Sequence, residues 1–159
     1  MSSITVILNG YRRPENLSLQ IDSIKKQTAC PHQVWLWINH HEDFNQENID
    51  LSSIGIDRVC RNDHNWKYFG RFALAMLAET DFVALFDDDT IPGEGWLENC
   101  LETYKKTPGI LGGVGLHLKS KESYMEHERF GWPSRNEETM EVDLVGHAWF
   151  INKDDLKYI

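Results

Sequence analysis

Short apolar runs alternate along this chain with segments whose apolar residues recur at helical spacing. Residues 4–8, 34–38 and 82–86 are continuous β-type runs, which are typical of strands buried on both faces of a parallel sheet. Residues 14–24 and 69–78 carry apolar positions spaced as on one face of a helix. Strands that alternate with helices predict βαβ units, and therefore an α/β domain with a mostly parallel sheet.

The remaining segments complete this pattern with less regularity. We expect a loop or short helix over residues 45–53 and a short strand within 54–60. A helix should begin near Trp96, followed by strands at 109–118 and 142–151 and a final helical turn from Lys153. Residues 119–141 are long, polar and irregular, which is typical of a functional lid or binding loop. The length of 159 residues predicts one domain.

Three carboxylates, Asp87, Asp88 and Asp89, directly follow the apolar run at 82–86. Adjacent like charges raise one another's pKa unless a cation neutralises them. Mg²⁺ and Mn²⁺ prefer such oxygen ligands, together with substrate phosphates, and open α/β sheets bind ligands at the carboxyl ends of their strands. A solvated acidic turn is the alternative. The strand before the carboxylates and the helix after them favour a metal held against a phosphorylated ligand.

Charge and composition narrow the range of partners. The net charge of −9 argues against a nucleic-acid partner, because no basic stripe is present to neutralise phosphates. The N-terminal residues lack a signal-peptide pattern and no apolar run is long enough to cross a membrane, so we expect a cytoplasmic protein. The three cysteines are far apart and form no CxxC pair, which predicts buried free thiols instead of a zinc site or disulfides.

Three segments resemble GT-A type glycosyltransferases, nearest to the family 2 and exostosin-like groups. The opening strand and loop is ITVILNGYRRPENL at residues 4–17, the run FDDDTIP at 86–92 looks like the DXD motif, and VGHAWF at 145–150 resembles a strand on the acceptor side. The resemblance implies a Rossmann-like nucleotide-diphospho-sugar transferase fold. It also implies a nucleotide-sugar donor, with UDP-sugar favoured, a bound Mn²⁺ or Mg²⁺, and a carbohydrate or other hydroxyl acceptor.

The same resemblance implies roles for residues at the matching positions. Tyr11 and Arg13 would lie beside the nucleotide base, Asn39 would close the base pocket, and Arg71 would approach the base or the diphosphate. Members of the family usually have Thr-Tyr-Asn-Arg where this chain has Gly-Tyr-Arg-Arg at 10–13. This departure leaves the choice of nucleotide open.

The resemblance also implies roles for the three carboxylates at residues 87–89. Asp87 would contact the ribose or the sugar, Asp88 would support donor binding, and Asp89 would hold the metal. Relatives continue past the strand at 142–151 to an acidic segment that supplies a catalytic base. We therefore expect residues 1–159 to be a single GT-A-like domain that lacks this segment, binds donor and transfers sugar poorly.

On the acceptor side, His147 and Asp143 are the candidates for a base, which must reach the attacking hydroxyl. A histidine in an apolar strand is more often a hydrogen-bonded core residue, so that alternative stays open for His147. Trp132 lies in the long polar segment. Its ring could stack on a sugar or pin the loop to the body of the domain.

Two other functions stay open beside a metal-dependent glycosyltransferase. A non-catalytic module that binds nucleotides or carbohydrates would share the donor-side motifs and lack turnover. Phosphatases of the haloacid dehalogenase type also place Asp-x-Asp after a strand. However, their motif lies on the first strand and has Thr or Val where this chain has Ile91. The sequence ranks the glycosyltransferase first.

Overall fold

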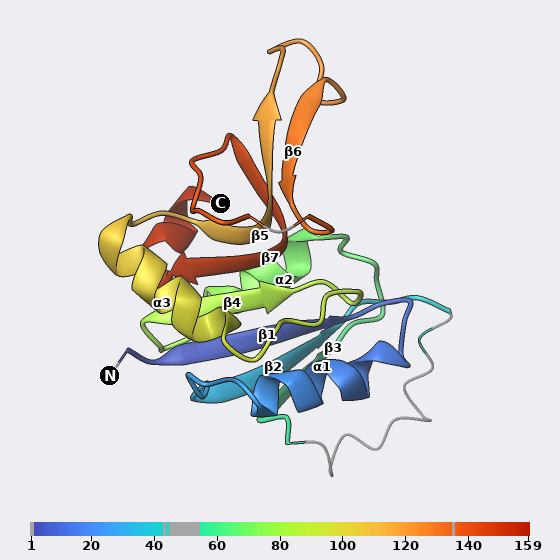
Figure 1. Cartoon of the computed structure of the whole chain (residues 1–159). Coiled ribbons are helices and arrows are strands. Elements are labelled where there is room, and N and C mark those ends of the chain that lie inside the picture. The colour runs from blue at the N-terminus through green and yellow to red at the C-terminus, as the bar shows by residue number, and fades with distance from the viewer. Residues whose placement is uncertain (1, 43, 45–54, 135) are drawn as a thin grey trace.

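The computed structural model describes residues 2–42, 44, 55–134 and 136–159, and within them seven strands form one sheet with helices on both faces (Figure 1). The strands are β1 (Ile4–Gly10), β2 (Gln33–Ile38), β3 (Arg58–Arg61), β4 (Phe82–Phe86), β5 (Leu111–Leu118), β6 (His127–Gly131) and β7 (Leu144–Asn152). The helices are α1 (Asn16–Lys25), α2 (Phe69–Ala75), α3 (Trp96–Lys106) and the 3-10 helix η2 (Lys153–Tyr158). The strand order across the sheet is β3-β2-β1-β4-β7-β5-β6.

The strand pairing in the sheet changes from parallel to antiparallel at β4. Strands β3, β2, β1 and β4 are parallel, as the alternation of strands and helices predicts. Strand β7 pairs antiparallel with β4, and β5 and β6 continue antiparallel beyond it. The expected α/β class is confirmed. The sheet is mixed because β5 is connected to β7 through β6 and turns, which allows antiparallel pairing, whereas a parallel pair would need a long crossover.

Two apolar clusters hold the layers together, one on each face of the sheet. The first joins Leu17, Ile21 and Ile24 of α1 to Phe86 and Phe150. The second places α2 and η2 over the opposite face, where Trp35 and Trp37 are buried. Because β1 and β4 are covered on both faces, their continuous apolar sequences are the expected consequence.

Strand β6 lies inside residues 119–141, which the sequence pattern predicted to be irregular. The strand is held by backbone pairing with β5, while Glu128 and Arg129 remain exposed. An exposed strand shows no apolar alternation, so periodicity could not reveal it. The β5–β6 hairpin projects from the body of the domain (Figure 1).

Other boundaries differ from the sequence-based expectation by a few residues. Strand β3 begins at Arg58, and α2 ends at Ala75, where i to i−3 backbone bonds replace the last expected helical turn. The segment 45–53 lies outside the described residues. The three cysteines are free as expected, but Cys30 is exposed and only Cys100 is fully buried.

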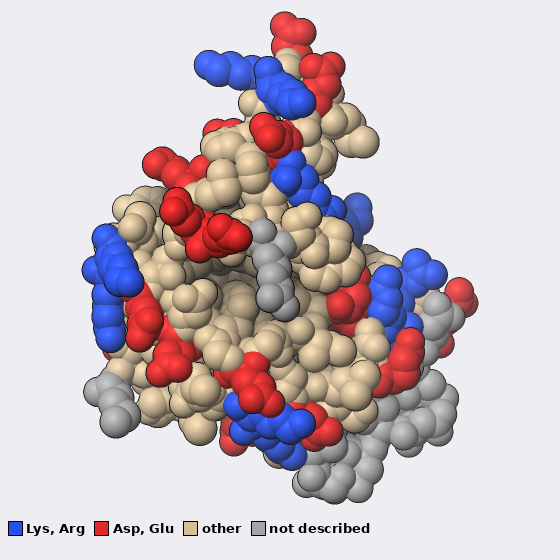
Figure 2. Space-filling view, viewed as in Figure 1, with Lys and Arg blue, Asp and Glu red and all other residues tan. Residues whose placement is uncertain are grey.

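Charged side chains of both signs lie on the surface of a chain whose net charge is −9. On the face shown in Figure 2, acidic and basic side chains are interspersed, and the described residues form no continuous basic stripe there. Among the residues that the structure describes, every helix is too short or too polar to cross a bilayer.

Candidate functional site

Polar side chains surround a cavity of about 420 Å³ at the edge of the sheet where β1, β2 and β4 end. These three strands are adjacent and parallel, so the residues that follow them converge at one edge. The cavity is lined by Asn9, Tyr11, Asn39, Asn65, Lys67, Tyr68, Arg71, Asp87 and Asp88. The fold therefore brings most of the donor-site residues predicted from the sequence to one place.

Asp88 ties the loop after β1 to the turn after β4. Its carboxylate is buried and accepts hydrogen bonds from the backbone N–H of Arg12 at 2.9 Å and from the guanidinium of Arg13 at 3.0 Å. Its carbonyl accepts a further bond from the side chain of Asn16. Asp88 thus faces the protein's own loop and fixes the positions of the Arg12 backbone and the Arg13 guanidinium.

Arg71 and Asp87 form an ion pair at the base of the cavity, with Nη2 of Arg71 2.7 Å from Oδ1 of Asp87. Desolvation raises the pKa of Asp87, and the charge of Asp89 adds to this rise, while Arg71 opposes it. Desolvation also lowers the pKa of Arg71. A carboxylate with a raised pKa beside further carboxylates favours an additional cation.

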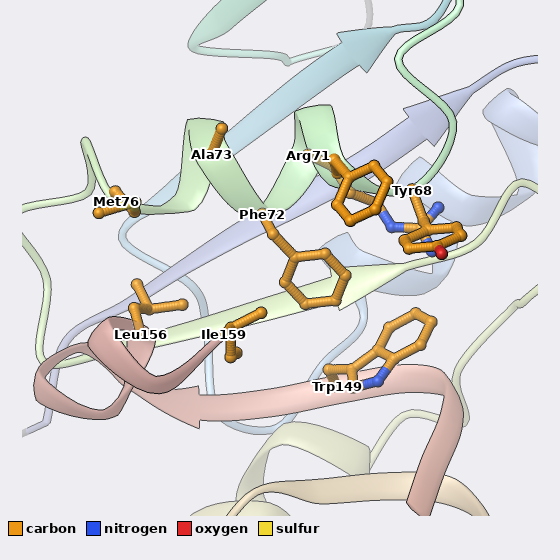
Figure 3. A pocket seen from close by; sticks show the side chains of 9 residues that line it. Tyr68, Arg71, Phe72, Ala73, Met76, Trp149, Leu156 and Ile159 are labelled. Atoms are coloured by element: carbon orange, nitrogen blue, oxygen red, sulfur yellow. The ribbon is translucent and has the colours of Figure 1, made fainter.

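The guanidinium of Arg71 separates this cavity from a second one. It lies 5.0 Å from the ring centroid of Trp149, and the rings of Phe72 and Trp149 meet edge to face (Figure 3). The second cavity measures about 590 Å³, is lined by the apolar side chains of α2, β7 and η2, and includes Leu156 and Ile159. Arg71 is thus fixed by aromatic packing on one side and by Asp87 on the other.

Asn39 organises the wall of the cavity opposite the carboxylates. Its side-chain amide donates to Oδ1 of Asn65 at 2.8 Å and to the carbonyl of Lys67 at 3.2 Å, while its Oδ1 accepts from the N–H of Trp66. Asn65 in turn donates to the hydroxyl of Tyr11 at 2.9 Å. Asn39 therefore lines the cavity, and its side-chain amide is engaged by the loop at 65–67.

Sequence reasoning missed several residues that line this cavity. Asn65, Lys67 and Tyr68 belong to a loop without periodicity, and the only available signal was the polar run that follows the third strand. The ring that packs on Tyr11 is His41, with centroids 4.7 Å apart. The neighbouring His40 is not among the lining residues.

Asn9 was also missed, because the sequence pattern places it in the loop after residues 4–8, whereas β1 extends to Gly10. Its side chain is 6% exposed and lines the cavity. Its Oδ1 has no hydrogen-bond partner among the described residues. An unsatisfied buried acceptor costs about 1–3 kcal/mol, so this oxygen suits an N–H donor of a bound ligand.

Asp89 is the accessible carboxylate of the acidic turn. Its side chain is 43% exposed, and Oδ2 lies 3.4 Å from Nη1 of Arg13. Within the described residues, no three His, Cys, Asp or Glu side chains are arranged to hold a metal ion. Mg²⁺ and Mn²⁺ commonly use one or two carboxylates and complete their shell with phosphate and water. The acidic turn fits that mode, in which the ligand supplies part of the coordination.

The structure brings His147 to the acidic turn and leaves Asp143 apart from it. The carbonyl of His147 accepts hydrogen bonds from Oγ1 of Thr90 at 2.9 Å and from the N–H of Asp87 at 3.4 Å. Asp143 lies four residues earlier, roughly 13 Å away along an extended chain. Its carboxylate accepts a bond from the N–H of Leu118, which lowers its pKa. Of the two candidates for a base, His147 is therefore the one whose backbone is bonded to the acidic turn.

A family model described as "Glycosyl transferase family 2" matches residues 5–156. The chain belongs to glycosyl transferase family 2. This membership confirms the GT-A type resemblance and the glycosyltransferase class expected from the sequence motifs, in preference to the phosphatase alternative. The search of curated proteins found no match.

Solved structures share the fold of this family 2 domain. One is a crystal structure of S. aureus TarS 1-349, with a TM-score of 0.62, 15% identity, and coverage of 98% of this chain and 48% of that chain. Another is a crystal structure of S. aureus TarS, with a TM-score of 0.63, 16% identity, and coverage of 98% of this chain and 29% of that chain. The structure of TarS 1-349 in complex with UDP-GlcNAc has a TM-score of 0.63 and 14% identity, and the match covers 98% of this chain and 47% of that chain. The chain thus spans less than half the length of these structures.

Replacing Asp88 by Ala should lower the free energy of unfolding of this family 2 domain by about 1–3 kcal/mol, because Arg12 loses the acceptor for its N–H and Arg13 loses its closest carboxylate. Urea unfolding measures this loss. Asp22→Ala, at an exposed carboxylate of α1, is the matched control and should change stability little. Similar unfolding curves for the two variants would contradict the role assigned to Asp88.

Proposed function

We propose that this glycosyltransferase domain binds a UDP-sugar through a divalent cation at Asp89 and transfers the sugar to a hydroxyl acceptor. One observation carries the proposal: an acidic turn with an accessible carboxylate adjoins a cavity whose buried acceptor, Oδ1 of Asn9, has no partner among the described residues. A nucleoside diphosphate presents both complementary groups, a base with N–H donors and phosphates that need a cation.

The nucleotide end of the cavity suits a uracil base. Tyr11 offers an aromatic ring, and Oδ1 of Asn9 would accept the imide N–H, which cytosine and adenine lack. Asn39 and Asn65 keep Tyr11 in place through its hydroxyl. The solved complexes of TarS with UDP and with UDP-GlcNAc support the choice of uridine for this chain.

The phosphate end combines two guanidiniums with three carboxylates, which leaves one negative charge in excess. Mn²⁺ or Mg²⁺ would be held by Asp89, with Asp87 beside it, and would neutralise charge on the departing diphosphate. Arg13 lies between Asp88 and Asp89, so its guanidinium is placed to pair with a phosphate oxygen as well. Arg71 keeps the carboxylate of Asp87 oriented through their ion pair.

Because this turn offers few protein ligands, we expect the chain to bind Mn²⁺ weakly alone and much more tightly when UDP is present. The diphosphate would complete the coordination shell. Electron paramagnetic resonance of free Mn²⁺, titrated with the chain in the presence and absence of UDP, measures this difference. Tight Mn²⁺ binding that does not depend on UDP would indicate a complete protein site elsewhere.

The direct test of function is the release of UDP from UDP-GlcNAc and UDP-glucose, measured by chromatography with Mn²⁺ and with EDTA. We expect slow release with Mn²⁺ and none with EDTA, since water can replace the acceptor. Metal-dependent UDP binding without any release or transfer would favour the non-catalytic module. Failure of UDP and both donors to bind would refute the proposal.

A further inference from the structure

We propose that Arg129, Trp132 and His147 form a subsite that binds a ring of a carbohydrate acceptor. This inference rests on the proposed function, because it assigns the acceptor half of the same site. The three residues come from β6, from the residue after it, and from β7, and His147 is hydrogen-bonded through its carbonyl to the acidic turn.

Strand β7 contains a β-bulge at His147. Gly112 pairs with Trp149 and Val114 pairs with Gly146, so β7 has one residue more than β5 over this stretch. His147 has a φ of 65°, in the left-handed region where a glycine would be unstrained. Bulges of this kind re-aim a side chain beside functional sites. A histidine kept at a position that favours glycine suggests that its imidazole has a use.

Trp132 is 65% exposed, yet its backbone is well anchored. Its N–H donates to the carbonyl of Gly113 at 3.4 Å, and the N–H of Gly131 donates to the side chain of Asn136 at 3.1 Å. Gly131 has a φ of 88°, and a Cβ there would overlap the carbonyl oxygen of Gly113. This anchored backbone therefore presents the indole to solvent as a flat apolar surface. Such a surface suits the C–H face of a sugar ring.

Polar groups lie directly beside this ring. The centroids of Trp132 and His147 are 5.7 Å apart, and Nη2 of Arg129 is 3.3 Å from Nε2 of His147. A guanidinium can only donate, so Nε2 is the acceptor and the proton of the neutral imidazole is assigned to Nδ1. That N–H is then available to a sugar hydroxyl. An indole face with donors at its edge is the combination that a sugar ring requires.

The position of the subsite matches that of an acceptor. The carbonyl of His147 is hydrogen-bonded to Thr90 and to the N–H of Asp87, so the bulge and the acidic turn are joined directly. A sugar stacked on Trp132 would bring its hydroxyls toward the donor sugar, whose bond to the diphosphate beside Asp89 breaks as the bond to the acceptor hydroxyl forms. Proximity of this kind is a main source of rate in group transfer.

The test is binding to a glycan array, with the biotinylated chain displayed on streptavidin and loaded with UDP and Mn²⁺. We expect the parent chain to bind at least one class of glycan and Trp132→Ala to lose about 10-fold of that signal or more, as base stacking on aromatic rings suggests. Trp132→Phe should retain part of it. Tyr124→Ala removes another exposed aromatic near the start of β6 and should bind like the parent.

His147→Gly separates a ligand-binding role from a structural one. Glycine relieves the left-handed backbone, so this variant should have a Tm equal to or above that of the parent while its glycan signal falls. A lower Tm with unchanged glycan binding would refute the role of His147. Binding of no glycan by the parent, with metal-dependent UDP binding intact, would overturn the subsite alone. Loss of UDP binding in the parent would instead refute the proposed function.

Discussion

Asp89→Asn is expected to reduce the affinity for UDP in the presence of Mn²⁺ by on the order of 100-fold, since even outer-shell partners of a metal contribute 10–100-fold. The amide keeps the shape of the side chain and removes the charge of the accessible carboxylate in the acidic turn. Because Asp89 is 43% exposed, the free energy of unfolding should change little. Quenching of tryptophan fluorescence by UDP, with Mn²⁺ and with EDTA, measures the loss.

The matched control for this variant is Glu94→Gln, which removes an exposed carboxylate from the same loop. It should bind UDP like the parent, with and without metal. In EDTA, the affinity of Asp89→Asn for UDP should be similar to that of the parent or somewhat higher. A carboxylate beside a diphosphate repels it when no cation intervenes. An affinity of Asp89→Asn equal to that of the parent in Mn²⁺ would remove Asp89 from the metal site.

Arg71→Met should lower the free energy of unfolding at neutral pH by about 3 kcal/mol. The methionine keeps the packing against Trp149, but Asp87 loses its partner in a largely desolvated position, which is the costly way to break a buried pair. Urea unfolding measures the loss. The double variant Arg71→Met with Asp87→Asn should recover part of it, because no buried charge is then left unpaired.

The pH dependence of this variant has a definite sign. Arg71 lowers the pKa of Asp87 against desolvation, so its removal raises that pKa further above the value in the unfolded chain. A raised pKa in the folded state adds stability below the ordinary Asp value near 4, and this stability is lost as the pH rises through the folded pKa. The deficit of Arg71→Met should therefore shrink between pH 7 and pH 4. A constant deficit would show that lost packing, and not the charge of Asp87, is the cause.

The positions of the residues that we assign to the donor side could be predicted from the sequence, because these residues follow buried parallel strands. The continuous apolar run at 82–86 identifies β4, and the carboxylates after it must then lie at the carboxyl edge of the sheet. Asn39 follows β2 in the same way. Each of these placements needs only the strand and its direction, which periodicity reveals.

Other features depend on contacts that a single sequence does not display. Strand β6 is stabilised by backbone pairing along exposed side chains, and the bulge at His147 becomes visible only when β7 is aligned with β5. The unsatisfied acceptor of Asn9 is recognised only once the cavity around its side chain is known. In each case a pairing partner or a cavity defines the feature, and neither has a local signature.

The central claim is that a cation at Asp89 joins the diphosphate to this domain, and isothermal titration of the parent chain with UDP tests it most directly. We expect UDP to bind about 100-fold more tightly in Mn²⁺ than in EDTA, corresponding to about 2.8 kcal/mol. The affinity in Mg²⁺ should lie between these two or equal that in Mn²⁺. Equal affinity for UDP in Mn²⁺ and in EDTA would contradict the account.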